Sequence, residues 1–258
     1  MSAPVGLHTS HMTKASPVPF YLRRAGARNL RLYFWMKRLL DIVASATLLV
    51  FFAPLMLAIA VAIKLDSDGP ALFAQERVGA RVRGKNGQRV WKAEAFTVYK
   101  FRTMRVNTSS ERHQAFVQAL IQKDEKALSA LQGEAQTTQH NKYKLVNDTR
   151  ITKVGSFLRK TSLDELPQLW NILIGDMSLV GPRPAIAYEV DMYREEHLGR
   201  LAATPGLTGI WQVTARSSVD FDGMAALDLE YIQQQSLWLD LVILVKTPLS
   251  VLMGKGAV

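Results

Sequence analysis

The feature that most restricts the fold of this chain is the apolar run from Ile42 to Ile63, which only Ser45, Thr47 and Pro54 interrupt. As a helix, a run of this length spans a hydrocarbon layer of about 30 Å. A buried helix in the core of a soluble protein is the weaker alternative, because soluble helices rarely stay apolar on every face for this length. The run therefore predicts a membrane segment that stays in the mature protein.

Basic residues lie on both sides of this run and bear on its topology. Those before it are Arg23, Arg24, Arg28, Arg31, Lys37 and Arg38, and those after it are Lys64, Arg77, Arg81, Arg83 and Lys85. Loops rich in Lys and Arg stay on the cytoplasmic side, so a single straight crossing does not satisfy both flanks. Pro54 lies near the middle, where its missing N–H and its ring let the helix break and turn back. We expect a re-entrant helical hairpin broken at Pro54, with a kinked single span as the alternative.

The composition narrows the partners and the chemistry. The chain of 258 residues has a formal net charge of +10, which favours nucleic acid, an anionic membrane surface or phosphorylated substrates as partners. It has no cysteine, so disulfides, thiolate metal sites and cysteine nucleophiles are excluded. Residues 1–12 are small, polar and aperiodic, like a cloning remnant, and they lack the apolar core and cleavage site of a secretory signal. We leave them out of the fold argument.

The rest of the chain divides by composition. Asp66 to Gly69 read as a turn and Val98 to Phe101 as one arm of a β-hairpin, with a basic, glycine-rich stretch at residues 79–87 between them. Residues 107–147 are rich in Gln, Glu, Lys, Ser and Thr, with apolar residues at helical spacing, which predicts an amphipathic helical insertion with a mobile end. The apolar run at residues 237–245 is too short to span, so we expect a helix in the membrane interface or, equally, a core helix of the soluble body.

An acidic pair, Asp164 and Glu165, stands in the segment from Thr161 to Pro167. This segment reads as the start of a helix, because Ser and Thr are good N-caps and Pro is tolerated in the first turn. The positive end of a helix dipole favours ionised carboxylates and also a bound phosphate, so a nucleophile and an anionic substrate can share the place if cations are added. A structural capping box of Ser162 and Glu165 is an equally good interpretation.

Cations near the pair in sequence favour phosphate binding. Arg183 lies between Pro182 and Pro184, which restrict its backbone and lower the entropy lost when its guanidinium grips phosphate oxygens. A surface arginine in a rigid turn is the alternative. The other basic residues are Arg159 and Lys160 before the pair, Lys100 and Arg102 in the segment 100–104, and Arg216 after the turn at residues 205–209 and the pair Trp211-Gln212.

Taken together, these blocks resemble the bacterial sugar transferase family, the small monotopic polyprenyl-phosphate phosphoglycosyl transferases. The matching blocks are, in order, Lys37–Asp41, Gly69–Gly79, Lys100–Met104, Asp148–Gly155, Arg159–Asn171, Gly175–Pro184, Pro205–Arg216 and Leu227–Ile232. Each block alone is a weak pattern, but all of them in this order cover nearly everything from Trp35 to the C-terminus except the polar insertion. The chain departs from the family in a longer loop from Arg81 to Ala95, in the insertion itself and in Ala53, which stands before the proline where Ser is common.

The resemblance implies a mainly α fold with a small β-hairpin. A basic segment at residues 1–34 leads into a re-entrant membrane helix at 35–66, and residues 67–258 form a compact cytoplasmic catalytic domain with interfacial amphipathic helices and the insertion at 107–147. It places the protein at the bacterial inner (cytoplasmic) membrane, with the catalytic domain on the cytoplasmic face.

The resemblance also implies a reaction: transfer of a sugar-1-phosphate from a UDP-sugar to polyprenyl (undecaprenyl) phosphate, with release of UMP, as the first membrane step of polysaccharide or glycoconjugate assembly. Asp164 maps onto the nucleophile, which would carry a covalent phosphosugar, and Glu165 onto the ligand of Mg²⁺. The residues expected to bind the phosphates or the nucleotide are Lys100, Arg102, Arg159, Arg183, Arg216 and Gln212.

Two alternatives stay open at this stage. A membrane-tethered binding protein would use its basic surface on nucleic acid or anionic lipid, with Arg150 to Asn171 imitating a helix-turn-helix, and its binding would fall steeply with salt. An enzyme with the same substrates could instead use Asp164 as a general base in one ternary complex. We expect the covalent enzyme, without a nucleic-acid partner. The sequence leaves the transferred sugar undefined and a homodimer open.

Overall fold

The structure is a computed structural model that describes residues 30–85, 88–106, 111–132, 149–215 and 219–252. Helices dominate it, and the described strands form one three-stranded antiparallel sheet and one two-stranded parallel sheet. The fold is therefore mainly helical with a small sheet, as the sequence predicts.

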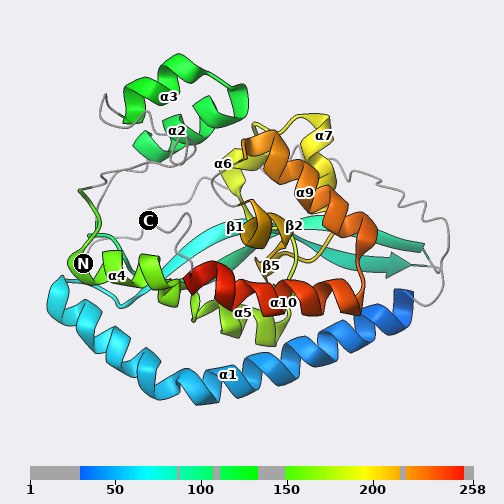
Figure 1. Cartoon of the computed structure of the whole chain (residues 1–258), viewed down its shortest axis with the longest axis horizontal. Helices are drawn as coiled ribbons and strands as arrows, with labels where there is room; N and C mark the ends of the chain where they lie inside the picture. Colours follow the sequence, from blue (N-terminus) through cyan, green and yellow to red (C-terminus); the bar gives the residue numbers. More distant parts are fainter. Residues whose placement is uncertain (1–29, 86–87, 107–110, 133–148, 216–218, 253–258) are drawn as a thin grey trace.

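The apolar run lies in α1 (Leu30–Asp66), a helix long and apolar enough to cross a membrane. Only 11% of its most apolar window is buried, which argues against the core helix of a soluble protein. Pro54 lies inside α1 without interrupting it, and Figure 1 shows the helix bent along the base of the molecule. The expected break is thus a bend in a continuous helix, as an internal proline produces when the turns around it stay helical.

The first half of α1 is tied to the body by its charged residues. Lys37 Nζ lies 2.8 Å from Asp240 Oδ2 of α10 (Leu237–Leu252). Arg38 donates to the carbonyl oxygens of Ile172 and Leu173 at 2.6 and 2.7 Å. Asp41 accepts hydrogen bonds in the same region, from the hydroxyl of Ser178 at 3.1 Å and the backbone N–H of Leu179 at 2.9 Å. These contacts explain why charged residues precede an apolar segment.

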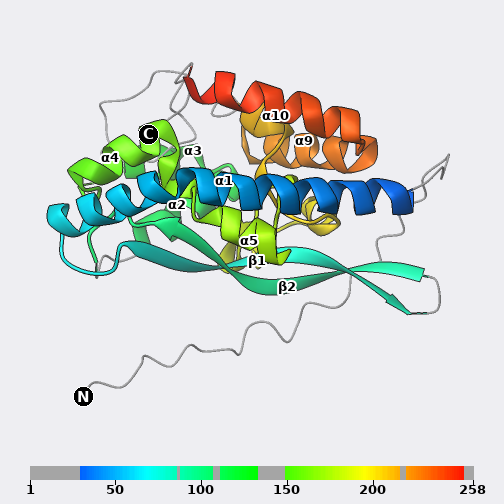
Figure 2. The ribbon, with the colours of Figure 1, turned by 90° about the horizontal axis from the view of Figure 1, so that it is seen from below.

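The β-hairpin is longer than the sequence predicts. Strands β1 (Leu72–Lys85) and β2 (Gln88–Phe101) pair antiparallel along their whole length, and β4 (Ala185–Ile186) joins the other edge of β1. The predicted loop from Arg81 to Ala95 is therefore wrong, because its residues pair across the hairpin. The alternation of Val with polar residues at 78–83 and 90–98 is a strand signal that the neighbouring glycines obscured. Figure 2 shows the hairpin as a twisted ribbon alongside α1.

The polar insertion begins with two helices, α2 (Glu111–Gln122) and α3 (Glu125–Gln132), which confirms the predicted amphipathic helix. Phe116 and Leu120 of α2 pack with Phe221 at the start of α9 (Phe221–Gln234). Figure 1 shows the pair on the opposite side of the molecule from α1. The predicted mobile end falls mostly at residues 133–148, outside the described residues.

The remaining elements form the body around the site. They are α4 (Lys153–Thr161), the short 3₁₀ helix η2 (Leu163–Glu165), α5 (Gln168–Ile174), β3 (Ser178–Val180), α6 (Ala187–Val190), α7 (Glu195–Leu198), η3 (Gly199–Leu201), β5 (Gly206–Thr208) and α8 (Ile210–Thr214). A central apolar cluster joins β2, α5, β3, α9 and α10 through Val98, Ile172, Val180, Tyr231 and Ile243. This core holds the site strand β2, and Leu163 of η2 packs against a second cluster of Ile59, Ile63, Phe101 and Leu158.

The C-terminal helix α10 combines the two roles that the sequence left open. Ile243 and Asp240 are buried against the body, whereas Trp238 and Val245 expose 73% and 62% of their surface. One face is therefore core, and the other is an apolar surface of the kind that suits a membrane interface.

Candidate active site

The acidic pair lies in a tight turn between two helices. Ser162 ends α4 in the left-handed conformation (φ 57°), and its backbone N–H donates to the carbonyl oxygens of Arg159 and Leu158. Asp164 and Glu165 follow in η2, and α5 begins only at Gln168. The pair therefore stands at the start of a helix, as predicted, but this helix is a three-residue 3₁₀ turn that is separate from α5. The capping-box interpretation is wrong, since the Ser162 side chain makes no capping hydrogen bond.

Lys100 of β2 is the direct partner of the second carboxylate. Its Nζ lies 2.7 Å from Glu165 Oε1, with both side chains partly exposed. Burial raises the pKa of Glu165, but the positive charges of Lys100 and, further off, Arg183 and Arg77 outweigh it and hold that pKa below its usual value. Glu165 is therefore ionised at neutral pH.

Asp164 has the opposite electrostatic balance. Burial and the negative charge of Glu165 raise the pKa of Asp164 to about 6, against the opposing effects of Lys100 and Arg159. Two adjacent carboxylates of different acidity result, and at pH 7 the Asp164 carboxyl is largely ionised but only partly neutralised by its surroundings. Such a group is a candidate nucleophile.

Two glycine-containing turns complete the site by approaching each other closely. Gly181 N–H donates to Thr208 O at 2.9 Å, and Gly206 N–H donates to Pro182 O at 2.8 Å. A Cβ atom on Gly206 would lie 2.1 Å from the backbone nitrogen of Gly181, so glycine is required there. This contact brings the Pro-Arg-Pro turn at residues 182–184 beside α8.

These elements enclose one polar pocket. It is lined by Arg77, Val98, Lys100, Glu165, Gln168, Arg183, Pro184, Gly206, Leu207 and Gln212. Four predicted residues, Lys100, Glu165, Arg183 and Gln212, thus come together from four separate segments of the chain. Asp164 adjoins the pocket through Glu165, and Arg159, whose Nε donates to Thr103 Oγ1 at 3.0 Å, acts on Asp164 electrostatically.

Two predicted phosphate ligands, Arg102 and Arg216, are not among the described residues that line the pocket. The guanidinium of Arg102 is buried and donates to the backbone carbonyl oxygens of Ser67 and Asp68, so it closes the turn after α1 instead of facing the pocket. Arg102 therefore does not line the pocket with the predicted phosphate ligands Lys100, Arg183 and Gln212. Arg216 lies outside the described residues.

Sequence reasoning missed two polar side chains that line the pocket, Arg77 and Gln168. Arg77 read as one of several cations after the apolar run, and only its pairing with Ile186 across β1 and β4 brings it to the pocket. Gln168 is the first residue of α5 and is buried. No local pattern marks either residue, because strand pairing and helix placement decide their positions.

The carboxylate that lines the pocket, Glu165, fits the metal that the resemblance implies. Mg²⁺ prefers oxygen ligands, keeps several waters and is commonly held by one or two carboxylates together with substrate phosphates. Glu165 is a partly exposed, ionised carboxylate at the pocket wall, which satisfies this preference. Lys100 holds one of its oxygens in the structure, so a metal ion at Glu165 would share or displace that contact.

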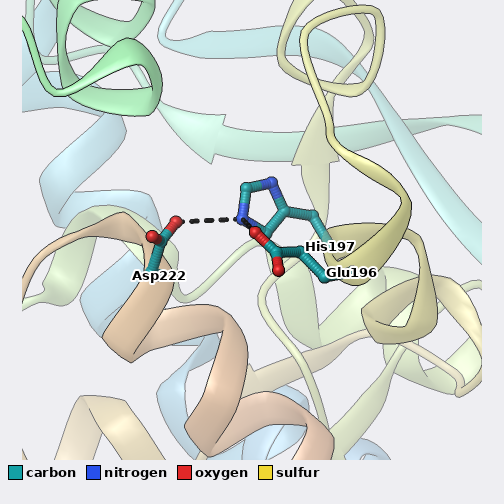
Figure 3. Close-up of side chains that lie close together, drawn as sticks. All are labelled: Glu196, His197 and Asp222. Atoms are coloured by element: carbon teal, nitrogen blue, oxygen red, sulfur yellow. Dashed lines mark hydrogen bonds and ion pairs between the residues drawn. The ribbon is translucent and has the colours of Figure 1, made fainter.

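A second group with metal-ligand chemistry is formed by Glu196, His197 and Asp222 (Figure 3), none of which lines the pocket. His197 Nδ1 accepts the backbone N–H of Arg194 at 3.3 Å, so Nε2 carries the proton and donates to Asp222 Oδ1 at 3.0 Å. The Arg194 guanidinium reaches both carboxylates, and Lys123 Nζ lies 2.6 Å from Asp222 Oδ2. Two cations therefore neutralise the two acids, and this group is better explained as an ion-pair cluster that joins α7, α9 and the turn between α2 and α3.

Comparison with known proteins places the chain in a family. A family model described as "Bacterial sugar transferase" matches residues 32–254. The chain belongs to the bacterial sugar transferase family. It is 40% identical over 223 residues to "Undecaprenyl-phosphate galactose phosphotransferase" of Salmonella typhimurium, a match that covers 86% of this chain and 42% of the relative.

Two further relatives show how the family varies in length. "Exopolysaccharide production protein ExoY" of Rhizobium meliloti is 34% identical over 248 residues, which is 95% of this chain and 98% of that protein. "UDP-glucose:undecaprenyl-phosphate glucose-1-phosphate transferase" of Klebsiella pneumoniae is 36% identical over 229 residues, 86% of this chain and 41% of the relative. This bacterial sugar transferase thus spans about two fifths of the longer relatives and nearly all of the shorter one.

Proposed function

We propose that this protein is a phosphoglycosyl transferase that moves a sugar-1-phosphate from a UDP-sugar to a polyprenyl phosphate, with release of UMP, through a covalent intermediate on Asp164. The observation that carries the proposal is the pairing of a weakly acidic aspartate with a pocket in which Arg77, Lys100 and Arg183 outnumber the single lining carboxylate, Glu165. Relatives that are named as undecaprenyl-phosphate sugar phosphotransferases support the same reaction.

The pocket suits a substrate with several negative charges. Phosphoryl transfer requires an aligned nucleophile and neutralisation of the phosphate oxygens, with little other covalent work from the protein. Lys100 and Arg183 both line the pocket and supply cationic donors from separate segments, and the Pro-Arg-Pro turn limits the backbone freedom that Arg183 would lose on binding. A diphosphate fits this excess of positive charge better than a neutral ligand.

The reaction would proceed in two displacements at one phosphorus atom. A carboxylate oxygen of Asp164 attacks the sugar-bearing phosphorus, the bond from that phosphorus to the bridging oxygen breaks, and UMP leaves with the bond's electron pair. The phosphosugar is then held as an acyl phosphate. A phosphate oxygen of the lipid attacks the same phosphorus and releases the Asp164 carboxylate, which returns the site to its starting state.

Glu165 would hold Mg²⁺, which when bound supplies positive charge to the diphosphate oxygens. Lys100 neutralises the pair from the other side and keeps Glu165 ionised, so it also keeps the metal ligand available. Arg159 favours the ionised form of Asp164, the form that can attack.

The lipid substrate requires the site to lie at a membrane surface. Helices α4, α5 and α10 each pack against α1, and they expose the apolar side chains of Phe157, Trp170, Ile174 and Trp238. Figure 1 shows these three helices close to α1 at the base of the molecule. We infer that α1 enters the inner membrane from its cytoplasmic face and, because of its bend, returns to the same face. The three helices then lie in the interface, and the pocket stays on the cytoplasmic side. A UDP-sugar then arrives from water and the polyprenyl phosphate from the bilayer.

The proposal is tested by incubating the protein with a panel of UDP-sugars, Mg²⁺ and polyprenyl phosphate, and following UMP release. We expect one or a few UDP-sugars to be turned over, and Asp164→Asn to abolish turnover while the circular dichroism of the protein is unchanged. Asp191→Asn, an exposed aspartate at the end of α6, is the matched control and retains activity. Full activity of Asp164→Asn would remove Asp164 from this role.

A further inference from the structure

Arg77 is a buried cation whose guanidinium is fixed at the wall of the pocket. It exposes only 6% of its surface. Its Nε and Nη2 donate to Gln75 Oε1 at 3.1 and 2.7 Å, and its Nη1 donates to Pro184 O at 3.1 Å. Gln75 and Arg77 are two residues apart in β1, so the alternation of a strand puts both side chains on one face. Three of the five N–H groups of the guanidinium are thus used within the protein.

The acceptor of the third hydrogen bond links Arg77 to Arg183. Pro184 immediately follows Arg183, and on the other side Pro182 O accepts the backbone N–H of Gly206 at 2.8 Å. The carbonyl groups before and after Arg183 are therefore held by separate partners, and the exposed Arg183 side chain is presented between them.

Beyond these two hydrogen bonds, the strand pairing next to the turn that carries Arg183 is short. Strand β4 is two residues long, and its pairing with β1 consists of Arg77 with Ile186 and Val78 with Ala185. So short a strand pair does little to fix the backbone of a neighbouring turn. The contact from Arg77 to Pro184 O therefore restrains the C-terminal side of Arg183, as the Gly206 N–H to Pro182 O hydrogen bond restrains its N-terminal side.

The charge of Arg77 is also unusual for a residue with only a structural task. Burial and the nearby positive charge of Arg183 lower the pKa of Arg77 to about 10. Two guanidinium groups held near each other repel, and Glu165 and Glu189 offset that repulsion only in part. A ligand with two negative charges would offset it further.

We propose that Arg77, held by Gln75, is a positioning residue that sets the direction of Arg183 toward the diphosphate of the substrate. This inference rests on the proposed function for the identity of the substrate, but it concerns any diphosphate in the pocket. Arg77→Lys keeps the charge but loses the planar fork that reaches Gln75 and Pro184 together. Its effect must therefore depend on the presence of Arg183.

A double-mutant cycle on the full-length protein in detergent tests this dependence. The dissociation constant for inorganic pyrophosphate, in the presence of Mg²⁺, is measured by calorimetry for the parent, Arg77→Lys, Arg183→Ala and the double variant. We expect Arg77→Lys to weaken binding about ten-fold in the parent and less than about two-fold in the Arg183→Ala background, because nothing is left to position. Equal weakening in both backgrounds would overturn the inference.

Arg102→Lys is the matched control. Arg102 is equally buried, at 5% exposure, and also donates to backbone carbonyl oxygens, but it does not line the pocket. We expect it to lower the unfolding temperature without changing the dissociation constant. If Arg77→Lys does not fold, Gln75→Met removes the support of the guanidinium and is expected to weaken binding in the parent but not in Arg183→Ala. Weakening that is the same in both would overturn the inference in this case too.

The cycle separates this inference from the proposed function. Coupling between the two arginines in pyrophosphate binding, with no turnover of any UDP-sugar, would keep the positioning role and remove the proposed reaction. Turnover of a UDP-sugar, without coupling between the two arginines in pyrophosphate binding, would keep the proposed reaction and remove the positioning role. A parent protein that neither binds pyrophosphate nor turns over a UDP-sugar would overturn both.

Discussion

Lys100 Nζ lies 2.7 Å from Glu165 Oε1, and this ion pair fixes strand β2 to the turn that carries Asp164. The two residues are 65 positions apart in the chain. The positive charge of the same ammonium group favours the ionised form of both Asp164 and Glu165, although the pKa of Asp164 stays raised overall. The ammonium group also lines the pocket, where it can bind the expected phosphate ligand.

Removal of this ammonium group is expected to reduce activity strongly. Lys100→Met leaves the Asp164 and Glu165 carboxylates with less compensating charge and removes a cation from the phosphate site, so kcat/KM for the UDP-sugar should fall about 10² to 10³-fold. The measurement is steady-state UMP release at several UDP-sugar concentrations. Lys160→Met, which removes an exposed lysine close to the pair in sequence, should change kcat/KM less than about two-fold. A similar loss in both variants would mean that general positive charge, not the Lys100 contact, is responsible.

The raised pKa of Asp164 predicts a pH-dependent gain in stability on its removal. An acid whose pKa rises on folding, here from 3.8 to about 6, binds protons more tightly in the folded state, so the free energy of unfolding falls as pH rises through this window. Asparagine has no ionisable carboxyl group, so the Asp164→Asn variant does not lose this part of the free energy of unfolding. In EDTA, Asp164→Asn should therefore exceed the parent in unfolding temperature by more at pH 8 than at pH 4. A difference that is the same at both pH values would contradict the raised pKa of Asp164.

The topology of α1 can be tested directly because the chain has no cysteine of its own. Leu32→Cys and Asp68→Cys place thiols at exposed positions near the two ends of the helix, and Phe51→Cys places one in its apolar middle. A re-entrant helix predicts that a membrane-impermeant maleimide labels both end positions in inverted membrane vesicles and neither in right-side-out vesicles. The position at 51 should stay unlabelled in both. Labelling of the two ends from opposite sides would establish a single span.

The ion pair between Lys37 and Asp240 predicts a large effect on stability. Asp240 also accepts hydrogen bonds from Tyr231 at 2.7 Å and Tyr33 at 3.0 Å, so this one carboxylate joins α1, α9 and α10. Lys37→Met leaves a buried carboxylate without its cation and should lower the free energy of unfolding by about 3–5 kcal/mol, measured by denaturation in detergent. Lys64→Met at the exposed end of α1 should cost less than about 0.5 kcal/mol. Equal, small effects would show that the α1 contact contributes little to the fold.

The sequence predicts the parts of this fold that depend on local patterns. The length of the apolar run defines α1, the spacing of Phe116 and Leu120 defines α2, and the order of the sequence blocks identifies Glu165, Lys100 and Arg183 as members of one site. In each case the signal lies within one segment or in the order of the blocks.

The parts that the sequence does not predict depend on contacts between distant segments. Arg77 lies in β1 and Arg102 directly follows β2, yet Arg77 reaches the pocket and Arg102 closes the turn after α1, because contacts with distant segments decide where each guanidinium lies. The extended pairing of residues 81–95 depends on the partner strand, and glycine-rich composition alone suggested a loop. The sequence predicts a helix start at the acidic pair because serine is a good N-cap. In the structure Ser162 adopts the left-handed conformation that ends the preceding helix.

The central claim is that Asp164 becomes covalently phosphorylated with a sugar attached, and exchange of labelled UMP tests it most directly. The protein is incubated with a UDP-sugar that it turns over, Mg²⁺ and labelled UMP, without any lipid phosphate. A covalent intermediate predicts that the label enters the UDP-sugar and that Asp164→Asn abolishes the exchange. An absence of exchange in an otherwise active parent would contradict the covalent route and favour direct transfer in one ternary complex.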